Sequence, residues 1–226
     1  MIKSFLKRYG LLIVFFIVFS VVAISSFNYV QTQEKKLPIY SPSMVSDELV
    51  EEELRYVKKY HRISDFSLLN QNGNNVTQED YKNKIYVADF FFTTCPSICP
   101  IMTKNMKILQ DQFIDDPNVL LLSHSVTPKI DTVAQLKKYA VEKGVMDKKW
   151  HLVTGSKKEI YDLARKSYLA VKTNSNQNLH TMIHTENFIL VDPDRRIRGF
   201  YDGTIREDMT KINEDISILK LEYSID

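Results

Sequence analysis

Two cysteines, Cys95 and Cys99, are the residues best suited to chemistry, and the 226-residue chain contains no others. They lie four positions apart in the segment FFFTTCPSICP, residues 90–100. Thiols at this spacing can bind a soft metal ion, exchange a disulfide with a partner, or close a structural disulfide. A structural disulfide stabilises mainly by closing a chain loop, and the gain grows with loop size. Because only three residues separate these cysteines, the structural role is disfavoured.

The residues around the cysteines predict a strand-to-helix loop. Pro96 and Pro100 would break a continuous helix through the segment, whereas Pro100 fits the first turn of a helix that starts near Cys99. The preceding run KIYVADFFF, residues 84–92, is almost wholly apolar and predicts a buried central strand. We therefore expect Cys99 close to a helix start, where backbone N–H groups and the helix dipole lower the pKa of a thiol.

The elements that must position these thiols alternate along the chain. A strand pair with a turn at Asn72-Gly73-Asn74 comes first, and three apolar strands then alternate with helices. A hairpin that turns at Asp192-Pro193-Asp194 and a closing helix end the pattern. Such alternation implies parallel strands joined by crossover helices. The pattern predicts an α/β protein with a thioredoxin-like fold, in which helices flank a central mixed sheet.

A third ligand would distinguish a metal site from a redox site, because two thiolates favour Cu(I) or Zn(II). The segment NLHTMIHTENF contains His180 and His184. In a thioredoxin-like fold, the loop that leads into the final hairpin faces the loop that carries the cysteines. His184, just before that hairpin, can therefore complete a site of two sulfurs and one nitrogen. From the residues alone, an ordinary surface histidine remains the alternative.

An apolar run, Leu11 to Phe27, predicts an N-terminal transmembrane helix. The basic residues before it favour a cytoplasmic N-terminus and an exported main domain. A cleaved signal peptide is the alternative, with a small-residue site at AIS, residues 23–25. We favour the uncleaved anchor because the apolar run is long and this site is poor. The run has no cysteine near it, so a lipid anchor on cysteine is not available.

Composition limits the class of protein. Hydrophobic residues make up 44% and charged residues 26% of the chain, which excludes global disorder. The net charge is +2, and no basic stretch is interleaved with aromatic residues, so nucleic-acid binding has no support. The expected organisation is a cytoplasmic tail over 1–9, a transmembrane signal anchor over 10–27, a linker and N-terminal extension over 28–60, and a thioredoxin-like domain over 61–226.

Beyond these patterns, the chain resembles the Sco/SenC family over residues 62–221. The resemblance is carried by FFFTTCPSICPIMTKNM, DTVAQLKKYA, HLVTGSKKEIYDLARKSY and HTENFILVDPDRRIRGFYDG, in this order. Family members are membrane-anchored, thioredoxin-like copper proteins that help to assemble the binuclear copper centre of cytochrome c oxidase. Some instead reduce the cysteines of that centre. The resemblance implies that Cys95, Cys99 and His184 bind copper, as Cu(I) or Cu(II).

The resemblance also implies a partner and a location. The partner would be the copper-bearing subunit of cytochrome c oxidase or another copper-dependent respiratory enzyme. The chain would cross a bacterial inner membrane once, with its soluble copper-binding domain, residues 61–226, on the periplasmic side.

Two positions and one segment depart from the family pattern. Ser97 stands where the family usually has an acid, and Ile183 precedes the histidine where the family often has Asp. Both changes remove negative charge near the site without removing a ligand. The segment SHSVTP, residues 123–128, departs from the usual S-x-D-P pattern, and we expect its His124 to be structural.

Copper delivery by a metallochaperone is the favoured function, and other roles stay open. In a thiol–disulfide reductase, Cys95 and Cys99 would attack a partner's disulfide and resolve the mixed disulfide, with no need for a histidine. A redox sensor is a further alternative. Met102 and Met106 recur at helical spacing with other apolar residues, so we expect them in the core rather than on copper.

Overall fold

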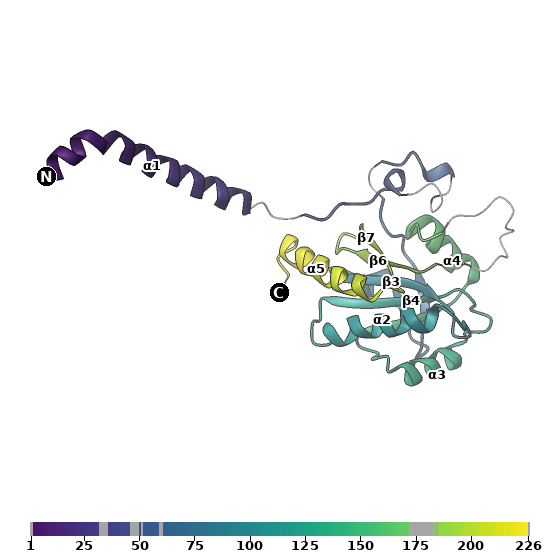
Figure 1. Ribbon diagram of the computed structural model, residues 1–226. Coiled ribbons are helices and arrows are strands. Elements are labelled where there is room, and N and C mark those ends of the chain that lie inside the picture. Colours follow the sequence, from purple (N-terminus) through teal and green to yellow (C-terminus); the bar gives the residue numbers. More distant parts are fainter. Residues whose placement is uncertain are drawn as a thin grey trace. The chain divides into compact units, whose positions relative to one another are not determined.

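The structure of the chain is a computed structural model, and it falls into two compact units, Met1–Lys36 and Leu37–Asp226. Helix α1, Ile2–Gln31, forms most of the first unit (Figure 1). Its segment Arg8–Ser26 is long and apolar enough to cross a membrane. The predicted N-terminal apolar helix is therefore present. The structure describes residues 2–31, 36–45, 50, 52–58, 61–171, 183 and 185–225.

Within the described part of the second unit, seven strands form one mixed sheet in the order β2-β1-β5-β4-β3-β6-β7. The central neighbours β3, β4 and β5 pair in parallel, and the other neighbours pair antiparallel. This is the predicted mixed sheet with a leading and a closing hairpin. The strands are β1 Ser67–Asn70, β2 Asn75–Thr77, β3 Ile85–Phe91, β4 Val119–Ser125, β5 Trp150–Thr154, β6 Asn187–Val191 and β7 Ile197–Asp202.

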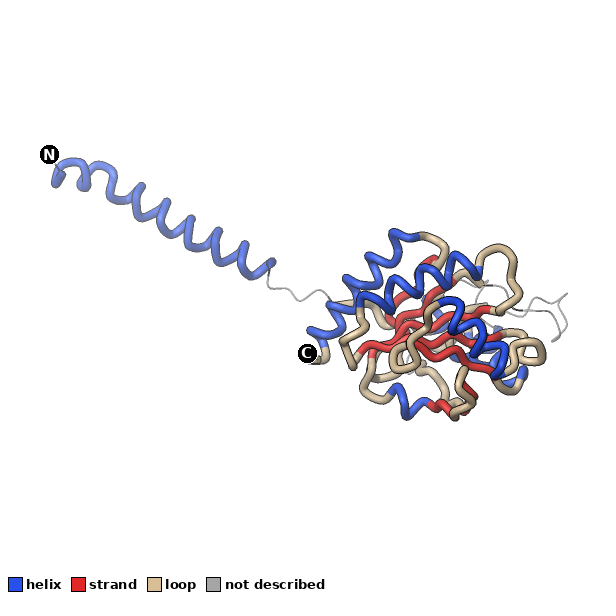
Figure 2. The backbone as a smooth tube through the Cα atoms, turned by 90° about the horizontal axis from the view of Figure 1, so that it is seen from below, coloured by secondary structure: helices blue, strands red, loops and turns tan. Residues whose placement is uncertain are grey.

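Helices α2, α3 and α5 pack together on one face of this sheet, and α4 lies on the opposite face (Figures 1 and 2). The crossovers through α2 and α3 step across the sheet in the same direction, and crossovers of one hand place both helices on the same face. The helices are α2 Cys99–Gln112, α3 Val133–Lys143, α4 Lys157–Asp162 and α5 Arg206–Glu222. Short turns of 3-10 helix cover Pro42–Met44, Glu52–Leu54 and Gln78–Tyr81, and a π-helical turn covers Leu163–Ser167.

The core packs against both faces of β3, whose seven residues are all buried. Such burial is what a central strand covered by helices requires. Helix α2 contributes buried side chains at the predicted spacing, including Met102 and Met106, which are fully buried. Trp150 at the start of β5 is also buried, and its indole N–H donates to Ser123 Oγ at 2.8 Å.

A buried arginine ties the residues before β1 to the hairpin of β6 and β7. Arg198 lies on β7 and donates to the carbonyl oxygens of Leu37 and Pro38 at 2.8 and 3.1 Å. It also forms ion pairs with Asp192 at 2.9 Å and Glu222 at 2.6 Å. The start of the second unit is therefore part of its folded structure.

Candidate metal centre

Cys95 lies on the loop from β3 to α2, and Cys99 lies where this loop meets the helix, as the sequence predicts. Cys99 is the first residue of α2, and Pro100 lies in the first turn, where its missing N–H costs no helical hydrogen bond. Both thiols are free and buried, with exposed fractions of 8% for Cys95 and 3% for Cys99. The backbone N–H of Cys99 donates to Cys95 Sγ at 3.5 Å. The first residue of α2 thus donates a hydrogen bond to the sulfur of Cys95.

The two thiols have opposite acidities. Burial raises the pKa of Cys95, but hydrogen bonds from the backbone and side chains of Cys99 and Ser97 outweigh it and lower the pKa to about 7. At Cys99, by contrast, burial dominates and raises the pKa to about 12, with the neighbouring Cys95 and Asp89 adding to the effect. Near neutral pH the pair therefore combines an available thiolate on Cys95 with a protonated thiol on Cys99.

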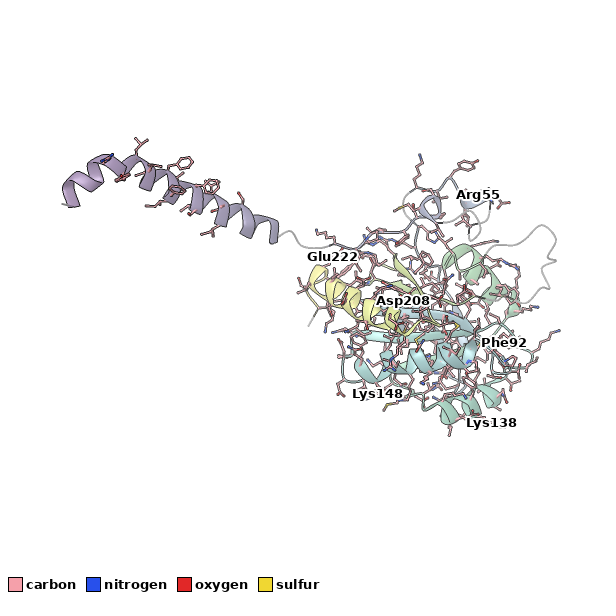
Figure 3. All side chains as sticks on the ribbon, in the orientation of Figure 1. Arg55, Phe92, Lys138, Lys148, Asp208 and Glu222 are labelled. Carbon is pink, nitrogen blue, oxygen red and sulfur yellow. The ribbon has the colours of Figure 1, made fainter. Side chains whose placement is uncertain are left out.

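A pocket of about 200 Å³ opens beside the first cysteine only. Cys95 lines this pocket and Cys99 does not, so an incoming group reaches the sulfur with the lower pKa. Lys138, labelled in Figure 3, lies on α3 and lines the same pocket. The lining residues are Thr93, Cys95, Pro100, Gln135, Lys138, Tyr139, Glu142 and Lys143.

A carboxylate that the sequence analysis left without a role anchors this loop. Asp131 is fully buried and accepts hydrogen bonds from both the backbone N–H and the hydroxyl of Thr93, two residues before Cys95. Ser125 and Thr127 donate to the same carboxylate. Asp131 lies next to the Thr132 N-cap of α3, and the sequence signal for it was only the Asp-Thr step at the helix start.

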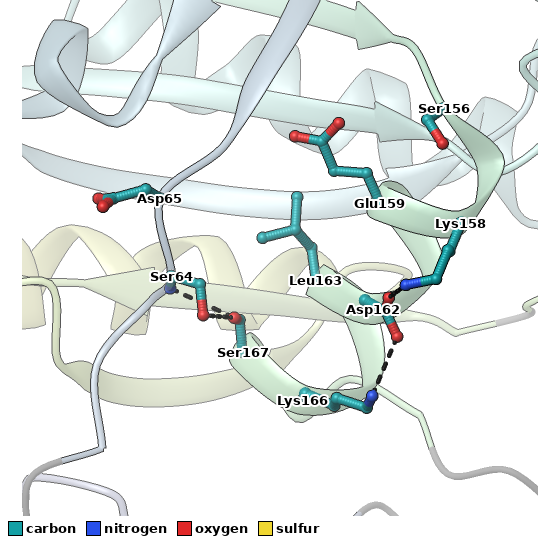
Figure 4. Close-up of a pocket in the computed structure, with 9 residues that line it drawn as sticks. All are labelled: Ser64, Asp65, Ser156, Lys158, Glu159, Asp162, Leu163, Lys166 and Ser167. Carbon is teal, nitrogen blue, oxygen red and sulfur yellow. Dashed lines mark hydrogen bonds and ion pairs between the residues drawn. The ribbon is translucent and has the colours of Figure 1, made fainter.

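A second, larger pocket of about 410 Å³ lies between α4 and the residues before β1, and the cysteines do not line it (Figure 4). Its charged side chains already have partners: Asp65 pairs with Arg195, and Glu159 accepts a hydrogen bond from the Ser67 backbone N–H. Asp162 forms ion pairs with Lys158 and Lys166, and Ser167 donates to Ser64. Because these groups satisfy one another, we place the functional site at the cysteine loop.

The described histidines do not complete a metal site. His124 lies inside β4, fully buried, with its ring stacked on Phe90 at 4.8 Å. Burial lowers its pKa to about 4, which keeps the ring neutral, in line with its expected structural role. Among the described residues, no three His, Cys, Asp or Glu side chains gather as metal ligands. The predicted third ligand, His184, and His180 lie outside the described residues.

The strand register shows at which end of the sheet β6 begins. Ala88 of β3 pairs with Ile189 of β6 in antiparallel register, so the start of β6 lies toward the end of β3 that leads into the cysteine loop. Ile183 and Thr185, which precede β6, are both buried. The chain therefore approaches β6 at the same end of the sheet as the cysteines.

The mixed sheet, its helices and the paired thiols at the start of α2 define a thioredoxin-like protein with a dithiol loop. The family model described as SCO1/SenC matches residues 55–218, and the chain belongs to this family. The predicted resemblance is thereby confirmed.

Individual relatives agree with this assignment. The SCO1 protein homolog of Bacillus subtilis (strain 168) is 34% identical over 158 residues, which is 69% of this chain and 81% of that protein. A structure that identifies a disulfide switch in BsSco, a member of the Sco family of cytochrome c oxidase assembly proteins, shares 34% identity and a TM-score of 0.58. It covers 71% of this chain and 95% of that chain, and confirms the thioredoxin-like fold.

Copper is the metal of a further relative. The crystal structure of Arabidopsis thaliana ScoI with copper bound is 26% identical, with a TM-score of 0.55, and covers 68% of this chain and 97% of that chain.

Proposed function

We propose that this chain carries copper for assembly of the copper centre of cytochrome c oxidase, with one ion held by Cys95, Cys99 and His184. The observation that carries the proposal is a pair of free thiols at the start of α2 in a chain of the SCO1/SenC family. The role is that of a metallochaperone rather than an enzyme, and copper is its cargo.

The donor set suits copper in either oxidation state. Thiolates are soft ligands that favour Cu(I), and an imidazole nitrogen supports Cu(II). Binding requires the Cys99 thiol to lose its proton, so copper competes with protons at this sulfur. A disulfide between Cys95 and Cys99 would remove two of the three donors. Loading therefore requires the reduced protein.

The location and partner belong to the same proposal. Residues 1–9 would lie in the cytoplasm, residues 10–27 would anchor the chain in a bacterial inner membrane, and residues 28–60 would link the anchor to the domain. The copper-binding domain, residues 61–226, would face the periplasm. The partner would be the copper-bearing subunit of cytochrome c oxidase or another copper-dependent respiratory enzyme.

Copper titration of the reduced full chain in detergent tests this function. We expect one tight copper per chain, with a Cu(II)–thiolate absorption band. His184→Ala should weaken binding, and the matched control His180→Ala should not. The double variant Cys95→Ser/Cys99→Ser should lose binding. Binding that is weak and indifferent to His184 would contradict copper carriage.

A thiol–disulfide reductase is the second candidate, and the unequal acidity of the two thiols favours it. Cys95 thiolate would attack a partner's disulfide, and Cys99 would then attack Cys95 Sγ and release the partner as a thiol. A redox sensor would use the same exchange. Cys99→Ser should trap a mixed disulfide on Cys95, which mass spectrometry can detect. If no adduct forms with a partner that carries a disulfide, the reductase is excluded.

A further inference from the structure

We propose that Asp131 is the positioning residue of the dithiol loop, because its carboxylate holds Thr93, and with it the loop to Cys95, against the loop between β4 and α3. Asp131 touches no reacting atom and acts through Thr93. The proposal rests on the proposed function in that it concerns the same two thiols.

Four hydrogen bonds converge on the fully buried Asp131 carboxylate. The Thr93 hydroxyl donates to Oδ1 at 2.6 Å, and the Thr93 backbone N–H donates to Oδ2 at 3.2 Å. The hydroxyls of Ser125 and Thr127 donate to Oδ2 at 2.6 and 2.9 Å. Hydrogen bonds to a charged acceptor are about twice as strong as neutral ones, so the carboxylate is a strong anchor for its donors.

The direction of these bonds makes the anchor specific. Gln135 Nε2 on α3 donates to Thr93 Oγ1 at 3.0 Å, so the Thr93 hydroxyl accepts from Gln135 and donates to Asp131. Similarly, Ser125 Oγ accepts from the backbone N–H of Thr127 and donates to Asp131. The Thr93 and Ser125 hydroxyls each accept one hydrogen bond and donate another. Residue 131 must therefore be a hydrogen-bond acceptor to satisfy both hydroxyls.

The Asp131 carboxylate joins the β3–α2 loop to the β4–α3 loop, and these two loops leave from neighbouring strands of the sheet. Phe91 and Ser125 are register partners at the carboxyl ends of the parallel strands β3 and β4. The cysteine loop leaves from the first strand, and the loop to α3 leaves from the second. Thr93 lies between β3 and Cys95, so loss of the anchor frees the segment that sets Cys95 Sγ beside the Cys99 N–H.

Asp131→Asn in the reduced full chain in detergent tests the proposal, with Asp192→Asn as the matched control. Asparagine offers one acceptor oxygen and adds N–H donors, so it cannot accept all four bonds. Asp192 is equally buried but receives Arg196 and Arg198 at the turn between β6 and β7, where Val191 pairs with Tyr86 at the far end of β3 from the cysteines. The Asp192→Asn variant therefore controls for the general effect of losing a buried carboxylate far from the cysteines.

Two readouts separate positioning from stability. We expect Asp131→Asn to weaken copper binding by about tenfold, as loss of a supporting partner does at metal sites. In the metal-free protein, we expect the ratio of Cys95 to Cys99 labelling by iodoacetamide to fall by about the same factor, because Cys99 loses protection and Cys95 loses its donor. Asp192→Asn should leave both readouts within about twofold of wild type, whatever its effect on the melting temperature.

A second pair of variants covers the case in which Asp131→Asn does not fold. Thr93→Val removes the hydroxyl with little change of shape, and Thr93→Ser keeps it. We expect Thr93→Val alone to reproduce the change in labelling. Labelling and copper binding that match wild type in folded Asp131→Asn, or in Thr93→Val, would overturn the proposal. If wild type binds no copper but the labelling ratio changes as expected, the proposed function fails and the role of Asp131 stands.

Discussion

At the scale of single residues, the two cysteines differ in thiol pKa because their sulfurs have different surroundings. Cys95 Sγ receives the N–H of Cys99, whereas Cys99 is enclosed by the core below the loop. The first sulfur is therefore available as a thiolate near neutral pH, and the second is not.

This difference predicts the pH dependence of labelling. The pKa of Cys95 is lowered to about 7, so its thiolate, the reactive form, increases as the pH rises through 7. Below pH 7 the alkylation rate of Cys95 should fall by about tenfold per pH unit, and above about pH 8 it should level off. Cys99, with a pKa of about 12, should stay unreactive over this range. Iodoacetamide labelling followed by mass spectrometry checks both curves. Two cysteines that titrate together near pH 9 would contradict the assignment.

The two methionines of α2 provide a second test at this scale. Met102 and Met106 are fully buried in the core, so their thioethers pack rather than bind. We expect Met102→Leu and Met106→Leu, which conserve volume, to cost less than about 1.5 kcal/mol and to leave copper affinity unchanged. Denaturant unfolding and copper titration measure the two effects. Loss of copper with retained stability would make one of these sulfurs a ligand.

At the scale of elements, the end of α3 depends on a glycine. Gly144 ends the helix in the left-handed conformation, with φ of 69°. A Cβ there would also lie 3.1 Å from Lys107 Cε. Gly144→Ala should therefore cost about 1 kcal/mol of unfolding free energy. Guanidinium unfolding checks this value. Val141→Ala, on the exposed face of the same helix, should change stability by less than about 0.5 kcal/mol. Equal losses in the two variants would argue against the backbone explanation.

The helix that follows β5 differs from what its local sequence pattern indicates. The run from Ser156 to Tyr168 has the pattern of one helix, but the structure has α4 and then a π-helical turn, Leu163–Ser167. The turn places the Ser167 hydroxyl next to Ser64 and its carbonyl next to His61, both on a distant segment. These hydrogen bonds join residues more than a hundred positions apart in the sequence. A prediction from a short stretch of sequence therefore cannot include them.

At the scale of the whole molecule, the N-terminal part of the second unit depends on Arg198. This side chain is 1% exposed, and it holds Asp192, Glu222 and the carbonyls of residues 37 and 38. Arg198→Met removes the buried guanidinium that pairs with the buried Asp192 and the partly buried Glu222, so we expect a loss of about 3 kcal/mol of unfolding free energy. Arg195→Met breaks only the exposed ion pair with Asp65 and should cost less than about 1 kcal/mol.

Urea unfolding of the full chain in detergent compares these two arginine variants. Copper affinity should stay unchanged in both, because Arg198 follows Ile197, which pairs with Val191 at the end of the hairpin away from the cysteine loop. If Arg198→Met is as stable as Arg195→Met, the buried network does not hold the N-terminal segment in place.

The sequence by itself determined the strand-to-helix loop, the start of α2 at Cys99, the apolar N-terminal helix and the Sco/SenC resemblance. Each depends on neighbours along the chain: Pro100 restricts the backbone locally, and apolar periodicity reports burial directly. Only the tertiary structure decided that Cys95 and Cys99 differ in acidity and that Asp131 holds Thr93. The acidity depends on burial in the folded core, and the anchor joins residues 38 positions apart, so both arise only when the sheet brings the loops together.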